Sequence, residues 1–210
     1  MKIAAVIPAY NEEKTLPAVL QPVLACSGLS EVIVVDDGST DNTAAVAEDM
    51  GARVLSLSPN AGKGGAVAAG FRSTDADVIL LLDADLTGLT ESHILTLLQP
   101  IRDGAADMTL GIFSSGRLLT NLAQKIAPQL TGQRAVRRAV LEAVSGLEMT
   151  RFGVEIALNR YARNVTLKTE IVLLPGMSHV MKEEKMGFFA GFCSRLHMYW
   201  NILRCYRDRC

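Results

Sequence analysis

Residues 78–85 read VILLLDAD, an apolar run that ends in two carboxylates. Its five consecutive apolar residues predict a short strand that is buried on both faces. Side chains alternate along an extended chain, so Asp83 and Asp85 point the same way. Both carboxylates can therefore approach one divalent cation, and hard oxygen ligands favour Mg²⁺ or Mn²⁺. The alternative interpretation is an ordinary polar strand end, with Asp85 capping the next turn.

Outward from this strand, the first half of the chain alternates apolar runs with segments of helical character. Strands are predicted at residues 3–8, 31–35, 53–57 and 107–112, and helices at 14–25, 41–50, 64–73 and 91–101. Asp41 is expected to cap the second of these helices. Apolar strands separated by helices predict an α/β fold, with a mostly parallel sheet covered by helices on both faces. In such sheets ligands bind beyond the carboxyl ends of the strands.

The second half of the chain is predicted to add further elements to this sheet. A basic helix is expected at 134–144, another helix at 154–163, an added strand at 166–174, a turn at 175–176 and a final helix from 188. The added strand is a candidate for antiparallel pairing. No internal repeat or linker is visible, which favours a single domain over 1–210.

Charge is distributed unevenly along the 210 residues, although the formal net charge is only −1. Residues 1–110 hold 6 Lys/Arg and 15 Asp/Glu, whereas residues 111–210 hold 15 Lys/Arg and 7 Asp/Glu. An acidic half followed by a basic half predicts that the two halves handle different ligands.

Composition excludes several protein classes. An apolar content of 49% excludes wholesale disorder. No run approaches the roughly 18 apolar residues that a membrane-spanning helix needs, and no signal peptide is evident. The cysteines lack CxxC spacing, so reduced thiols are expected, with Cys26 as a small buried residue. A cytoplasmic protein is therefore expected.

Two further loops follow predicted strands. Residues 36–41 read DDGSTD, and their carboxylates can accept hydrogen bonds from a base or a ribose, the alternative being a turn with a helix cap. Residues 60–64 read NAGKG, a glycine-flanked lysine before a helix, which suits a phosphate. This second loop is not a Walker A motif, because glycine follows Lys63. A flexible helix start is its alternative interpretation.

These loops, together with IPAYNEE at 7–13 and DAD at 83–85, resemble the motifs of family-2-type glycosyltransferases, in the same order and spacing. The resemblance implies the GT-A fold, a nucleotide-diphospho-sugar donor (UDP- or GDP-linked) and bound Mg²⁺ or Mn²⁺. It implies that Asp85 holds the metal. The implied donor-binding residues are Pro8, Ala9, Tyr10, Glu12, Asp37, Lys63, Asp83 and Ala84.

The second half resembles glucosyl-3-phosphoglycerate synthases through GRLLT at 116–120, LTGQR at 130–134, FGVEI at 152–156 and His179. This resemblance implies that His179 completes the metal shell and that Lys182 faces the diphosphate. The implied acceptor-binding residues are Arg117, Thr120 and Arg134. The implied halves are 1–112 for the nucleotide-sugar and 113–186 for a small anionic, phosphoglycerate-like acceptor. The spacing after Gly116-Arg117 and the residues after His179 depart from the family pattern. A surface histidine is the alternative for His179, whereas His93 and His197 are expected to be structural or surface residues.

Glu155 follows a glycine at the start of a predicted helix, and several roles are open to it. In inverting members of the larger family an acidic residue near this place is the catalytic base, which deprotonates the acceptor hydroxyl. In retaining relatives it contacts the acceptor or the sugar instead. A carboxylate that complements the helix dipole is the plain alternative.

The last segment, 187–210, is predicted to be an amphipathic helix. Apolar residues recur along it at Phe189, Phe192, Leu196, Tyr199, Leu203 and Tyr206, accompanied by arginines. The stripe can pack on the domain, on a second copy in a homodimer, or on an anionic membrane surface. The membrane reading fits the alternative acceptor, a polyprenyl phosphate at the inner face of the membrane. Nucleic acid is not an expected partner.

Two other functions compete with transfer of a sugar. A sugar nucleotidyltransferase shares this kind of sheet. Enzymes of that class carry a Gly-rich, Arg-bearing loop after the first strand, whereas this chain has PAYNE at 8–12 in that place. A non-catalytic sugar-nucleotide-binding protein is opposed by the intact Asp83/Asp85 pair.

Overall fold

The structure is a computed structural model that describes residues 1–114, 131–144 and 153–179. The chain divides after Ser178 into a large unit, Met1–Ser178, and a second unit, of which only His179 is described. The predicted helix at 187–210 therefore lies outside the described residues, and the single-domain organisation stays a prediction. Among the helices of the described ranges, none has both the length and the apolar character needed to cross a membrane.

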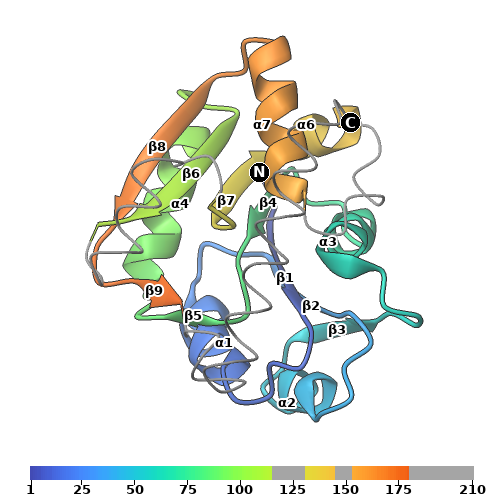
Figure 1. The fold of residues 1–210 in the computed structure, drawn as a ribbon. Helices are drawn as coiled ribbons and strands as arrows, with labels where there is room; N and C mark the ends of the chain where they lie inside the picture. Colours follow the sequence, from blue (N-terminus) through green and yellow to red (C-terminus); the bar gives the residue numbers. More distant parts are fainter. Residues whose placement is uncertain (115–130, 145–152, 180–210) are drawn as a thin grey trace, which may run out of the picture. The chain divides into compact units, whose positions relative to one another are not determined.

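The large unit is built on a seven-stranded sheet within the described residues (Figure 1). In spatial order its strands are β3 (Arg53–Ser56), β2 (Glu31–Asp36), β1 (Ile3–Ala9), β4 (Val78–Leu81), β7 (Arg134–Arg137), β6 (Met108–Phe113) and β8 (Thr169–Leu174). Every pair of neighbours is parallel except the two pairs that β7 makes with β4 and β6. The parallel strands therefore end at one edge of the sheet, where a ligand site is expected.

Helices cover both faces of the sheet, because strands such as β1 are apolar on both sides (Figure 1). The core on one face joins the strands to α1 (Leu16–Ala25), α2 (Thr43–Asp49) and α4 (Glu91–Arg102). The core on the other face joins them to α3 (Gly62–Arg72), α6 (Arg138–Ala143) and α7 (Val154–Asn164). This arrangement confirms the predicted fold class.

Three local predictions were wrong. Residues 134–137, predicted as the start of a helix, form β7, because they fill an antiparallel slot between β4 and β6. The strand predicted at 166–174 is β8, but it runs parallel to β6, whereas antiparallel pairing had been the candidate. Asp41 does not occupy the N-cap of α2, which is Asn42; its carboxylate accepts a hydrogen bond from the Thr43 amide at 3.0 Å.

A small second sheet lies beside the end of β4. It pairs β5 (Leu86–Thr87) with β9 (Ser178–His179). Gly88 has φ +74°, and a side chain on it would collide with the carbonyl group of Gly176. The turn at 175–176 was predicted correctly, and the loop after Asp85 packs directly against it.

Candidate functional site

The loops that follow β1 and β2 are held together by hydrogen bonds. The amides of Asn11 and Glu12 donate to the hydroxyls of Ser39 and Thr43, at 2.9 and 2.8 Å. In return the Thr40 amide donates to Asn11 Oδ1 at 2.8 Å, and Asn11 adopts φ +56°. The two motifs predicted to bind the nucleoside thus form one continuous platform at the edge of the sheet.

Asp37 anchors the loop that leads into α3. The residue is 4% exposed, and its Oδ1 accepts a hydrogen bond from the Ala61 amide at 2.7 Å. The main-chain carbonyl of Asp37 accepts a second hydrogen bond, from Asn60 Nδ2 at 2.8 Å. Of the other predicted nucleoside residues, Glu12 accepts a hydrogen bond from the Thr15 hydroxyl, whereas Tyr10 is 49% exposed. Asp37 therefore helps to position Lys63, which lies two residues beyond Ala61.

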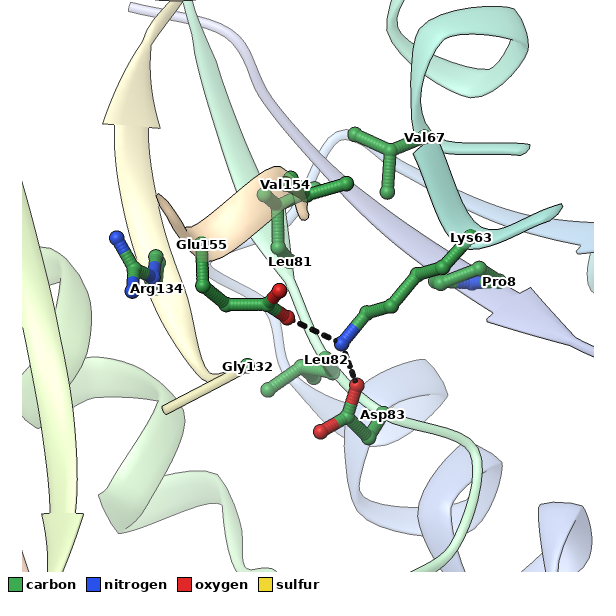
Figure 2. Close-up of a pocket in the computed structure, with 10 residues that line it drawn as sticks. All are labelled: Pro8, Lys63, Val67, Leu81, Leu82, Asp83, Gly132, Arg134, Val154 and Glu155. Carbon is green, nitrogen blue, oxygen red and sulfur yellow. Dashed lines mark hydrogen bonds and ion pairs between the residues drawn. The ribbon is translucent and has the colours of Figure 1, made fainter. Parts of the chain in front are cut away.

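A pocket lies where α3, the end of β4 and the start of α7 meet (Figure 2). It is lined by Pro8, Lys63, Val67, Leu81, Leu82, Asp83, Gly132, Arg134, Val154 and Glu155. Lys63 Nζ lies 2.6 Å from Asp83 Oδ1 and 2.5 Å from Glu155 Oε1, so the ammonium group bridges the two carboxylates. These side chains are 12–28% exposed, so their ion pairs are partly shielded from water.

The surroundings shift the pKa values of the two pocket cations in opposite directions. Burial lowers the pKa of Lys63, but the charges of Asp83 and Glu155 outweigh it, and the pKa rises well above its ordinary 10.5. Burial also lowers the pKa of Arg134, to about 10, against the opposing effects of Glu155 and Asp83. Both cations therefore remain protonated at neutral pH, in a pocket that the side chains of Asp83 and Glu155 also line.

Arg134 lines the pocket but is almost fully buried, with only 1% of the residue exposed. Its Nε donates to the Thr131 carbonyl at 2.8 Å, and Nη1 donates to Asn159 Oδ1 at 2.8 Å. The bond to Asn159 ties β7 to α7, the helix whose first turn carries Glu155 (Figure 2). The contact between Arg134 and an acceptor stays a prediction.

Gln133 belongs to this site, although the sequence did not single it out. Its side chain is fully buried, and Nε2 donates to Asp83 Oδ2 at 2.8 Å. The neighbouring Gly132 lies so close to Asp83 that a Cβ atom would stand 2.7 Å from Oδ1 and closer still to Oδ2. The only signal in the sequence was the motif at 130–134, which does not tell which residue faces the carboxylate.

A group that could hold a metal ion lies next to the pocket. One ligand atom each from Asp83, Asp85 and His179 falls within 4.8 Å of the others. Carboxylate oxygens with one imidazole nitrogen form a donor set that fits Mn²⁺ or Mg²⁺. Asp85 and His179, the two residues predicted for the metal, thus offer ligand atoms near each other, and Asp83 offers a third.

Other predicted residues lie elsewhere. Arg117, Thr120 and Lys182 fall outside the described residues. His93 is 8% exposed and forms a reciprocal cap with Thr90 at the start of α4, so the expected structural role is confirmed. Cys26 is 4% exposed, as predicted for a small buried residue.

Comparisons with known proteins identify the family. The model of the glycosyl transferase family 2 matches residues 4–155. An undecaprenyl-phosphate 4-deoxy-4-formamido-L-arabinose transferase of Serratia proteamaculans is 33% identical over 189 residues, which cover 79% of this chain and 58% of that protein. The corresponding protein of Yersinia pestis is 31% identical with the same coverage. The chain thus spans 58% of the length of these curated relatives.

Solved structures agree with this assignment. Glucosyl-3-phosphoglycerate synthase from Mycobacterium tuberculosis, in complex with Mn²⁺, UDP-glucose and phosphoglyceric acid, superposes with a TM-score of 0.71 at 28% identity. The match covers 85% of this chain and 71% of that structure. The same enzyme with phosphoglyceric acid alone gives a TM-score of 0.71 at 27% identity. The fold is therefore GT-A, and the chain belongs to glycosyl transferase family 2.

Proposed function

We propose that this protein transfers a sugar from a nucleotide-diphospho-sugar, with a divalent metal ion, to an acceptor that carries a phosphate group. The observation that carries the proposal is the cluster of Lys63, Asp83 and Glu155, in which Asp83 is also one of three potential metal ligands. Support comes from the related synthase, whose complexes contain Mn²⁺, UDP-glucose and phosphoglyceric acid. The curated relatives are named for transfer to undecaprenyl phosphate.

Each group of the site has a proposed task. Asp85 and His179 would hold the metal ion, which supplies positive charge to the diphosphate when it is bound. Lys63 would add a second positive charge at the departing diphosphate. Glu155, which shares Lys63 with Asp83, would face the acceptor hydroxyl or the sugar. The platform formed by the loops after β1 and β2 would bind the nucleoside.

The balance of charge in the pocket predicts that metal and nucleotide bind together. Lys63 and Arg134 already offset Asp83 and Glu155, so a lone cation or a lone diphosphate would disturb this balance. A divalent ion and a diphosphate offset each other and can enter jointly. We expect Mn²⁺ to tighten the binding of UDP or GDP by about 10- to 100-fold, measured by calorimetry with and without the ion.

Mg²⁺ is the natural comparison in this experiment, and Asp85→Asn is the matched variant. The variant should lose most of the effect of the metal while keeping the weak binding of nucleotide alone. If the protein did not bind the nucleotide, or bound it equally well with and without either ion, the proposed function would be contradicted.

Two acceptors are candidates, each with its own support. A small phosphorylated acid is the first, because the related structures hold phosphoglyceric acid. A polyprenyl phosphate is the second, because the curated relatives act on undecaprenyl phosphate by name. Peripheral contact with a membrane surface is proposed only together with this second acceptor.

Product analysis separates the two acceptors. UDP- and GDP-sugars are incubated with the protein and either 3-phosphoglycerate or a polyprenyl phosphate in detergent, and the products are identified by NMR. For the first candidate we expect product with 3-phosphoglycerate and no need for detergent. Product only with the lipid would establish the second candidate and exclude the first.

A further inference from the structure

Gln133 is a buried amide that points at one carboxylate of the site. Nε2 donates to Asp83 Oδ2 at 2.8 Å, while Lys63 Nζ holds the other oxygen, Oδ1, at 2.6 Å. We infer that Gln133 is a positioning residue, which fixes Asp83 for the joint binding of metal and nucleotide. This inference rests on the proposed function.

The two partners hold Asp83 from different parts of the fold. Lys63 comes from the first turn of α3, whereas Gln133 directly precedes β7. A carboxylate that accepts one hydrogen bond on each oxygen loses its freedom to rotate about the bond to its Cβ atom. The direction of Asp83 is therefore set before any ligand arrives, which is the condition for a site with little cost of reorganisation.

Gln133 is itself held in place. Its amide oxygen lies 2.9 Å from the Thr131 hydroxyl, which is also 2.6 Å from the Gly111 carbonyl. Its main-chain carbonyl accepts a hydrogen bond from the Gly111 amide at 2.9 Å. An ionised carboxylate can only accept hydrogen bonds, so the NH₂ group of Gln133 is the end that faces Asp83.

The neutral charge of Gln133 matters for the chemistry. Lys63 already pairs with Asp83, so a second lysine in this place would compete further with a metal ion for that carboxylate, and a glutamate would repel it. An amide donates a hydrogen bond and adds no further positive charge beside Asp83. Gln133 thus orients a carboxylate that lies within 4.8 Å of the other potential ligands, without removing its attraction for a cation.

The test compares Gln133→Met with the wild type in the full chain, by calorimetry of UDP and by the EPR signal of free Mn²⁺. Methionine keeps a similar volume but cannot donate. We expect Mn²⁺ to bind at least about 10-fold more weakly, and UDP to lose a similar factor only when Mn²⁺ is present. UDP binding without metal should stay unchanged.

Thr109→Val is the matched control for the loss of a buried hydrogen bond. Thr109 is fully buried on β6, and its hydroxyl donates to the Leu97 carbonyl at 2.7 Å, on the side of α4. This control should lower the melting temperature without changing the binding of Mn²⁺. Thr131→Val, which removes the hydroxyl beside the amide oxygen of Gln133, should weaken Mn²⁺ binding by a smaller factor. This variant replaces Gln133→Met in the test if Gln133→Met does not fold.

The outcomes separate the inference from the proposed function. If the wild type binds UDP without any response to Mn²⁺, the proposed function fails. If the wild type responds to Mn²⁺ and the Gln133 and Thr131 variants respond equally, the proposed function survives and the positioning role is overturned. An equal loss in Thr109→Val would also overturn it, because the effect would then be a general one on stability.

Discussion

Replacement of Lys63 by methionine is expected to lower the free energy of unfolding by about 2–4 kcal/mol, because two partly buried carboxylates lose their shared cation. Lys63 Nζ lies 2.6 Å from Asp83 and 2.5 Å from Glu155, so both oxygens would face each other without compensation. Sugar transfer is expected to fall by about 100- to 1,000-fold, the usual effect of removing one preorganised charge from a transition state. Chemical denaturation and a transfer assay measure the two effects.

The dependence of this stabilisation on pH has a definite sign. The carboxylates raise the pKa of Lys63 above 10.5, despite burial, so the folded protein holds this proton more tightly than the unfolded chain. The contribution of Lys63 is therefore complete below about pH 10 and is lost as the pH rises further. The difference in stability between wild type and Lys63→Met should be constant from pH 7 to about 10 and shrink above it.

An exposed lysine provides the control. Lys2 pairs with Asp75 at 2.7 Å, but the two side chains are 63% and 81% exposed. Lys2→Met should leave the unfolding transition essentially unchanged, because water screens such pairs. The double variant Lys63→Met/Glu155→Gln should regain part of the lost stability and none of the activity. If Lys63→Met and Lys2→Met unfolded at the same denaturant concentration, the role assigned to the ion pairs of Lys63 would be contradicted.

The alternation of strands and helices was predictable from sequence because its signals are local. Most of the run at 78–82 forms β4, and Asp83 directly after it lines the pocket. β7 was missed because residues 134–137 continue without a break into α6, so their composition resembles a helix. What makes them a strand is the open position between β4 and β6, to which residues far away in the sequence contribute.

The chemistry of the site was predicted less completely than the fold, for the same reason. Lys63 was expected near the nucleotide from its glycine-flanked motif, but its partners stand 20 and 92 positions away. Gln133 meets Asp83 across 50 positions. A motif tells which residue types are present, whereas the pairing of an amide with one oxygen of one carboxylate is decided by the packing of β4 beside β7.

Replacement of Gly132 by alanine is expected to weaken the binding of UDP with Mn²⁺ by about 100-fold and to lower the free energy of unfolding by about 1–3 kcal/mol. The added Cβ atom would stand 2.7 Å from Asp83 Oδ1 and 2.8 Å from Cγ, which real Cβ atoms do not tolerate. Either the carboxylate or the strand must move. Movement of the carboxylate breaks its bonds to Lys63 and Gln133.

Two further variants distinguish this collision from a general effect of losing a glycine. Gly104 has φ +72° and open space around it, so Gly104→Ala should cost stability through backbone strain and leave binding intact. Asp83→Ala removes the atoms that the new Cβ meets. In the double variant Gly132→Ala/Asp83→Ala, the glycine replacement should therefore cost at least about 1 kcal/mol less than it does alone. Strict additivity would place the strain elsewhere, whereas strong coupling would identify the carboxylate of Asp83 as the group for which position 132 must be glycine.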